Sequence, residues 1–483
     1  MNAADDDLDL KIQKLSSDLI VDLDKALITF LRKPDGNGGT RVRSYVRARD
    51  AFAATCDVID NFQELPQLLD PHLPKWIPFL AQSYLENLTD PRRSAAKRGT
   101  SGKSTALVPV SYAISKILYT FCKVRGEKVI VRFLNAEAKY LELLLSSIEE
   151  AELETAAANL SPDPDALFTP VQGWAWEQRY IALLWLSHLL FAPFDLSTIS
   201  SVEFEDAAVP EIEGLQLQDN LPGITLRMLP LAIKYLATAG KERDAAKALL
   251  VRMSMRKDMQ SLGVLDSLIG WALTSLRPRK DVEQHRPAYF YLGILSFLAA
   301  VLRSSSETSD LDRHLSSIFN AVHAVTFNDT EVSKTVNALA LARKMIIKVL
   351  RSVVVTLLRK ANKDMQSMEV TETAIGYLLE SLSDNDTPVR MSASKSLSVV
   401  TLKLDPDMAA QVVEAVLESL NRNVLWNKEE MKQGARPVRD LSAVNHLEWH
   451  GLVLTLSHLL YRRSPPREAA LGYYTRLATG FII

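Results

Sequence analysis

The sequence predicts an all-α protein, a HEAT/armadillo-like α-solenoid of stacked antiparallel helix pairs. Over most of the 483 residues, apolar side chains recur at steps of three and four, the spacing of one helix face. In the second half, helical segments come in pairs at a spacing of about 40–47 residues, the period of HEAT and armadillo arrays. Strict alternation of apolar and polar residues over a strand length is almost absent. These observations favour helix-on-helix packing throughout.

Length and composition narrow the class of protein. A single core rarely grows beyond about 250–300 residues, so several domains or a repeat array are expected. The net charge of −2 gives no field that would attract nucleic acid or a membrane surface, and neither is an expected partner. The longest apolar stretch, 181–192, is too short for a membrane span, which needs about 20 residues. Two cysteines, Cys56 and Cys122, are too few for a disulfide framework or a zinc site and fit a reducing cytosol.

Residues 1–160 are expected to form N-terminal helical repeats. The first helix carries an apolar stripe at Leu8, Ile12, Leu15, Leu19, Leu23, Leu27 and Phe30. The segment from Pro34 to Gly39 should end it, because proline and glycine continue a helix poorly. Asp70 is a candidate N-cap for a later helix, with Pro71 at its first position. Other helices are expected near 43–62, 107–123 and 127–158, with a basic loop near 90–104.

A proline-containing linker at 161–173 leads to a second array, 174–483. It begins with a dense apolar helix and an acidic loop near 197–220, which holds six acids and no lysine or arginine. The expected helix pairs are 222–239 with 241–256, 259–276 with 286–303, 311–326 with 331–360, 369–382 with 386–403, and 407–421 with 440–461. After about 463 the array is expected to be truncated or divergent, because a terminal repeat needs a polar capping face and this one ends apolar.

The inter-helix turn at 383–390 is the clearest single repeat unit. Asp386 can cap the second helix, Pro388 suits its first turn, and Arg390 can reach an aspartate in its own or the neighbouring turn. Asn385, Asp386 and Arg390 are the candidate partner-binding residues. The alternative is that Arg390 serves only the structure of the repeat.

The candidate motifs for catalysis and metal binding do not have the residue spacing that these functions require. A phosphate loop ending in Gly102-Lys103 would need glycine where Lys97 stands, and a preceding buried strand. His446 and His450 are four apart, but a zinc-protease helix needs glutamate directly after the first histidine. We therefore expect a non-catalytic protein with no cofactor and no metal. The basic and acidic loops either steer a charged partner or are solvated surface. Trp176 and Trp185 are expected on opposite helix faces.

Several segments, kept in order along the chain, resemble the tubulin-specific chaperone D family, also called tubulin-folding cofactor D. The most specific runs from Trp176 to Leu196: Trp-Glu-x-Arg-Tyr, an apolar helix, then Pro-Phe-Asp-Leu. Shorter matches occur at Leu68–Leu73, Ile117–Tyr119, Lys123–Gly126, Arg243–Ala246, Asp384–Lys395 and Trp449–Gly451. The resemblance covers roughly residues 65–460.

The resemblance implies a chaperone that binds β-tubulin after chaperonin release and helps assemble the α/β-tubulin heterodimer. It implies cooperation with tubulin-folding cofactors C and E and a small Arf-like GTPase, in a cytoplasmic, cytoskeleton-associated setting. Promotion of GTP hydrolysis would act through partners, since the catalytic nucleotide sits on tubulin. Family members are more than twice this length, so an N-terminal part or truncated form is expected. The alternative is a generic HEAT-repeat protein–protein scaffold unrelated to tubulin.

Overall fold

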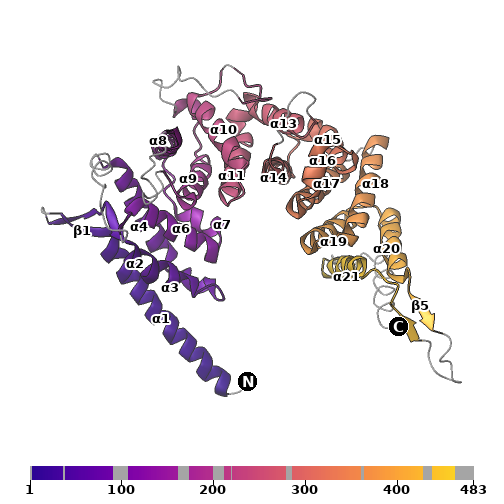
Figure 1. The fold of residues 1–483 in the computed structure, drawn as a ribbon, viewed down its shortest axis with the longest axis horizontal. Coiled ribbons are helices and arrows are strands. Elements are labelled where there is room, and N and C mark those ends of the chain that lie inside the picture. Colours follow the sequence, from indigo (N-terminus) through magenta and orange to yellow (C-terminus); the bar gives the residue numbers. More distant parts are fainter. Residues whose placement is uncertain are drawn as a thin grey trace. The chain divides into compact units, whose positions relative to one another are not determined.

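The structure, a computed structural model, describes residues 3–35, 38–90, 107–160, 173–199, 212–218, 220–278, 286–360, 364–427 and 438–462. Its described residues are mostly helical, with only short strands, which confirms the predicted fold class (Figure 1). They divide into two compact units, and each unit is described by itself. Unit 1 is Met1–Ile212 with Leu217–Val264, and unit 2 is Glu213–Gln216 with Leu265–Ile483.

Unit 1 contains two short two-stranded antiparallel sheets and a series of packed helices. The helices are α1 (Ala3–Leu31), α2 (Ala48–Ala51), α3 (Asp57–Asp60), α4 (Leu73–Thr89), α6 (Val110–Arg125), α7 (Glu127–Ile130), α8 (Tyr140–Leu160), α9 (Trp176–Leu189), α10 (Gly223–Leu236), α11 (Glu242–Ser254) and α12 (Lys257–Ser261). The strands are β1 (Arg32–Asp35), β2 (Gly39–Val42), β3 (Tyr45–Arg47) and β4 (Leu107–Pro109). Helix α9 packs against α6, α8 and α11, so the helix with the distinctive sequence lies in the core of this unit.

The predicted helix at 43–62 is the main local difference. Its first residues form β3, which pairs antiparallel with β4 so that Val46 lies opposite Val108. A π-helical turn at Phe52–Cys56 then interrupts the helix. The strand pairing joins segments about 60 residues apart, and it buries Val46. A three-residue strand is too short to leave an alternation pattern in the sequence.

Two other helix boundaries differ for local polar reasons. The expected helix 127–158 breaks, because the Asn135 side chain accepts a hydrogen bond from the Glu137 amide at 2.9 Å and forms a turn. The helix expected to begin near Asp70 begins at Leu73, with His72 in the capping position. Asp70 instead accepts a hydrogen bond from Arg125 Nη2 at 2.7 Å, which lowers the pKa of its carboxyl group.

Unit 2 holds the remaining helices and a third two-stranded antiparallel sheet. Its elements are α13 (Val264–Ser275, from Leu265 onward), α14 (Ala288–Ser304), α15 (Leu315–Phe327), α16 (Glu331–Asn337), α17 (Ala340–Arg359), α18 (Met365–Glu380), α19 (Thr387–Thr401), α20 (Pro406–Asn421), β5 (Leu425–Asn427), β6 (Val438–Asp440) and α21 (His446–Tyr461). Helices α14, α17, α19 and α21 pack in succession, and α15, α18 and α20 pack beside them (Figure 1). This is the stacking of a helical repeat array.

The predicted division of the chain into segments 1–160 and 174–483 stays a prediction. The two compact units divide near residue 264, and nearly all of the expected linker 161–173 lies outside the described residues. The expected basic loop near 90–104, most of the acidic loop near 197–220, and the segment after 463 also fall outside them. The predicted repeat boundaries there stay predictions.

Candidate protein-interaction sites

The turn between α18 and α19 is tied to the neighbouring repeat by Arg343. Arg343 Nε lies 2.8 Å from Asp384 Oδ2, and its Nη2 lies 2.6 Å from Asp386 Oδ2. Asp386 occupies the capping position of α19, but its side chain makes no capping hydrogen bond, contrary to the expectation. The carboxylate of Asp386 is instead bound to Arg343 on α17, so this acid joins two repeats.

Arg390 binds backbone carbonyls of the same turn. Its Nη1 donates to the carbonyl oxygens of Asp384 and Asn385 at 2.6 and 3.0 Å, and Nε donates to His450 Nδ1 at 3.0 Å. The expected contact with an aspartate carboxylate is not among them; the guanidinium reaches main-chain oxygens because the turn folds back over it. Arg390 is only 6% exposed, whereas Asn385 and Asp386 are exposed. Partner binding at Asn385, Asp386 and Arg390 stays a prediction, and the contacts of Arg390 described above hold the turn.

Gly451 explains how α21 can approach this turn. A Cβ atom at Gly451 would lie 2.2 Å from the carbonyl oxygen of Leu382, closer than any side chain allows. The glycine therefore lets the backbone of α21 touch the 3-10 turn Ser381–Ser383 that follows α18. His450, its neighbour, is placed at Arg390 by the same close approach.

Arg179 gives the Trp-Glu-x-Arg-Tyr stretch a structural role. Its Nη1 donates to the carbonyl oxygen of Trp174 at 2.7 Å, and its Nη2 lies 3.3 Å from Glu242 Oε1 on α11. The guanidinium also faces the ring of Tyr235 at 5.8 Å from the centroid. These contacts join α9 to α10 and α11.

The aromatic residues of α9 build the core around it. The Tyr180 hydroxyl donates to Glu127 at 3.0 Å, and burial raises the pKa of this tyrosine. Trp185 is fully buried and donates its indole N–H to the carbonyl oxygen of Asn135 at 2.7 Å, within the break described above. Trp176 is half-buried with its ring edge-on to Tyr119. Trp176 and Trp185 therefore have different neighbours, Tyr119 and Tyr84 respectively, and their placement on opposite faces stays a prediction.

After α9, the loop 190–196 is held by Arg256 and Asp258. Arg256 donates to three carbonyl oxygens of the loop, those of Leu190, Ala192 and Phe194, at 2.6, 3.0 and 2.7 Å. Its Nη2 also lies 2.8 Å from Asp258 Oδ2, and both side chains are nearly buried, at 9% and 10% exposure. Asp258 Oδ2 in turn accepts the Leu196 amide at 3.0 Å. We call this arrangement the loop clamp.

The loop clamp affects the acid it contains. Burial by itself would raise the pKa of Asp258, but hydrogen bonds from Arg256 and from the Leu196 amide outweigh it, so the pKa of Asp258 is lowered. Sequence reasoning missed both clamp residues, because they follow the loop by more than 60 positions and no spacing rule connects them. The only trace in the sequence was the Pro-Phe-Asp-Leu segment, where helical periodicity stops and an aromatic residue remains.

The clamped loop exposes two aromatic side chains. Phe191 is 58% exposed and Phe194 is 62% exposed. The guanidinium of Arg252, on α11, lies over the Phe191 ring at 3.4 Å from its centroid, and the His188 ring meets Phe191 edge-on at 5.9 Å. Burial lowers the pKa of both His188 and Arg252.

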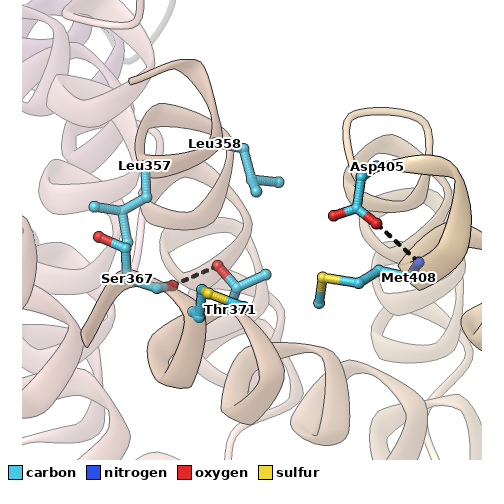
Figure 2. Close-up of a pocket in the computed structure, with 7 residues that line it drawn as sticks. Leu357, Leu358, Ser367, Thr371, Asp405 and Met408 are labelled. Carbon is cyan, nitrogen blue, oxygen red and sulfur yellow. Dashed lines mark hydrogen bonds between the residues drawn. The ribbon is translucent and has the colours of Figure 1, made fainter. Parts of the chain in front are cut away.

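Two hollows lie within unit 2. Figure 2 shows the smaller, where Leu357 and Leu358 of α17 face Met408 of α20 across Ser367 and Thr371 of α18. Its volume of about 30 Å³ would hold roughly one water molecule. The dashed bonds are local to each helix: Thr371 donates to the Ser367 carbonyl, and Asp405 accepts the Met408 amide. This hollow is too small for a cofactor.

The larger hollow is a groove between the end of α13, the length of α15 and the start of α16. It has a volume of about 350 Å³, and its lining includes Arg277, Asn320, Asn328 and Thr330. The lining mixes polar and apolar groups and has the character of an inter-helix surface. It brings together no pair of acids or acid and base set for proton transfer.

The described residues contain no group of three or more histidine, cysteine or acidic side chains arranged to hold a metal. Cys56 and Cys122 are both buried free thiols, and burial raises the pKa of each. No helix in the described ranges is long and apolar enough to cross a membrane.

Comparison with known proteins identifies the repeats. The family described as "Tubulin-specific chaperone D-like, ARM repeat" matches residues 59–276, and a second ARM-repeat model of the same description matches residues 328–436. The chain is 26% identical over 444 residues to tubulin-folding cofactor D of Schizosaccharomyces pombe, which covers 86% of this chain and 33% of that protein. It is 22% identical over 502 residues to tubulin-specific chaperone D of Dictyostelium discoideum, covering 84% of this chain and 32% of that protein.

The matches enclose the features that the structure shows to organise each unit. The first family match contains the α9 helix and the loop clamp, and the second contains the turn at 383–390. The chain spans about one third of the length of the curated relatives that it matches. It belongs to the tubulin-specific chaperone D-like family of ARM-repeat proteins.

Proposed function

We propose that this chain binds β-tubulin and takes part in assembling the α/β-tubulin heterodimer after chaperonin release. The observation that carries the proposal is the family match over two separate ARM-repeat segments, together with relatives named as tubulin chaperones that align with most of the chain. Stacked helix pairs suit this role, because repeat arrays present extended surfaces to a folded client.

The proposed role needs no catalytic residue on this chain. Tubulin-folding cofactors C and E and a small Arf-like GTPase are the proposed further partners, in the cytoplasm and at the cytoskeleton. Promotion of GTP hydrolysis would act on the nucleotide held by tubulin, so this chain would contribute by binding. The inter-helix surfaces described above, with their paired arginines and acids, offer such contacts.

Binding of purified components tests the proposal. The tagged chain would be immobilised, and purified tubulin would be titrated over it by interferometry, with and without purified cofactors C and E and the Arf-like GTPase. An unrelated HEAT-repeat protein of similar length and net charge is the matched control. We expect saturable binding to this chain and none to the control.

A second measurement separates capture from activity. GTP hydrolysis by tubulin would be followed with the three partners present and this chain added last. Because the chain covers one third of its relatives, a full-length relative provides the positive control. Tubulin binding by the relative but not by this chain would refute the proposal for this chain, and binding by neither would leave the generic scaffold.

A further inference from the structure

We propose that Phe191, Phe194 and Arg252 form a docking surface for a partner segment in which a carboxylate lies beside an apolar side chain. We call these three residues the aromatic–arginine patch. All three belong to unit 1, and the loop clamp holds two of them. The proposal concerns the chemistry of the bound segment and does not depend on the proposed tubulin role.

The loop that carries Phe191 and Phe194 is held rigidly. Phe191 and Phe194 lie on a loop whose carbonyl oxygens at Leu190, Ala192 and Phe194 all bind the guanidinium of Arg256. A loop fixed in this way presents its side chains in one arrangement, so a partner would lose little conformational entropy on this side of the contact. The exposure of the two rings is therefore a lasting property of the folded loop.

Both phenylalanine side chains of this loop are exposed. The two phenylalanines, at 58% and 62% exposure, are three positions apart, with Ala192 and Pro193 between them. Aromatic side chains bury large areas at interfaces and are frequent among the residues that dominate binding energy. Holding both in water lowers stability slightly, so a folded loop that displays them is typical of a contact surface.

The described residues contain three arginine–aromatic stacks: Arg179 over Tyr235, Arg286 over Phe290, and Arg252 over Phe191. Arg179 is paired with Glu242 at 3.3 Å, and Arg286 is paired with Glu213 at 3.0 Å.

Arg252 differs from both. It has no ion pair with an acid among the described residues, although its guanidinium lies closest to its ring, at 3.4 Å. Within the part of the chain that the structure describes, its partly buried charge therefore lacks the carboxylate that accompanies the other two stacks. A carboxylate from a partner would complete the same arrangement, since a guanidinium binds carboxylate oxygens in a planar, bidentate geometry.

These features together define the ligand. The phenylalanines favour a leucine, methionine or aromatic side chain, and Arg252 favours a glutamate or aspartate next to it. His188, the other titratable group facing Phe191, has a lowered pKa from burial and from Arg252, so it is neutral near pH 7 and adds no charge. The specificity for an acid is thus assigned to Arg252.

The test uses a panel of fluorescein-labelled 12-residue peptides that alternate glutamate with leucine or phenylalanine, measured by anisotropy against the complete chain. Each peptide has a counterpart with glutamine in place of glutamate. Arg252→Gln should weaken binding of the acidic peptides about tenfold and leave the glutamine series unchanged. Phe194→Ser should weaken both series, because it removes apolar contact and no charge.

Phe327→Ser is the matched control, because Phe327 is also 58% exposed but lies in unit 2. It should leave binding unchanged. Hydrogen exchange of residues 188–196 checks that the variants keep the loop folded. The proposal is overturned if no acidic peptide binds more tightly than its glutamine counterpart, or if Phe327→Ser weakens binding as much as Phe194→Ser. Tubulin titrated against the same variants reports separately on the proposed function, since tubulin binding can persist when peptide binding fails.

Discussion

Arg256 in unit 1 and Arg390 in unit 2 are both nearly buried arginines that hold a loop by its backbone carbonyls, yet their surroundings differ. Arg256 has a nearly buried carboxylate partner, Asp258, which is itself bound to the loop. Among the described residues, Arg390 has no carboxylate partner and donates instead to Nδ1 of His450, to the Thr387 hydroxyl and to backbone carbonyl oxygens. One loop is therefore held by an arginine with a nearly buried carboxylate partner, and the other by an arginine whose acceptors include no carboxylate.

This difference has an energetic consequence. Removing one partner of a buried ion pair leaves the other charge uncompensated, whereas removing an arginine that has no carboxylate partner leaves unsatisfied hydrogen-bond acceptors but no uncompensated charge. The clamp of unit 1 should therefore be the more sensitive of the two to loss of its arginine. Substitutions at each arginine test whether the carboxylate accounts for that difference.

The largest effect is expected for Arg256→Met. It leaves Asp258 nearly buried without its cation and three carbonyl oxygens of loop 190–196 without a donor, so we expect a loss of about 3–5 kcal/mol in the free energy of unfolding of unit 1. Urea unfolding, with hydrogen exchange in α9 and α11 as the reporter of unit 1, measures it. Lys257→Met, at the exposed neighbouring position, is the control. A loss equal to that of the control would show that the clamp does not stabilise the unit.

Arg390→Met should cost less, about 1–3 kcal/mol, because no buried carboxylate is left behind. Hydrogen exchange in α19 and α21 reports the loss in unit 2. Lys395→Met, on the exposed face of α19, controls for removal of a charge. If Arg390→Met destabilised unit 2 more than Arg256→Met destabilised unit 1, the carboxylate would not explain the difference between the two loops.

The stacked-helix architecture was predictable because it rests on periodicity, and a three-to-four residue repeat survives in every helix pair of unit 2. The hydrogen-bonded networks were not. Arg390 was singled out from its turn, but its partner His450 lies 60 residues away, and only Gly451 at the helix contact allows them to meet. Arg256 and Asp258 gave no signal at all. Contacts between repeats depend on which helix surfaces pack together, and the local spacing of apolar residues does not determine this.

The lowered pKa of Asp258 predicts how the comparison changes with pH. A carboxyl group whose pKa is lower in the folded than in the unfolded chain adds stability above its unfolded value, about 3.9. That contribution is lost as pH falls through the folded pKa. The stability difference between the native chain and Asp258→Asn should therefore be constant from about pH 7 to 5 and shrink below about pH 4. Urea midpoints of unit 1 at each pH measure it. A difference that grew on acidification would contradict the assignment of the charge to Asp258.

The smallest effect is expected at Asp386, in the turn between α18 and α19. Asp386 binds Arg343 at 2.6 Å, but its side chain is 51% exposed, and solvent screening limits such pairs to under about 1 kcal/mol. Asp384, at 16% exposure, pairs with the same arginine at 2.8 Å from a less solvated position. Asp384→Ala should therefore destabilise unit 2 more than Asp386→Ala, and the Arg343→Met background should reduce both losses, since each acid then lacks its cation. Equal losses from the two alanine variants would mean that burial does not govern the strength of these pairs. In that event the difference in stability between the Arg256 and Arg390 variants would also need a cause other than burial.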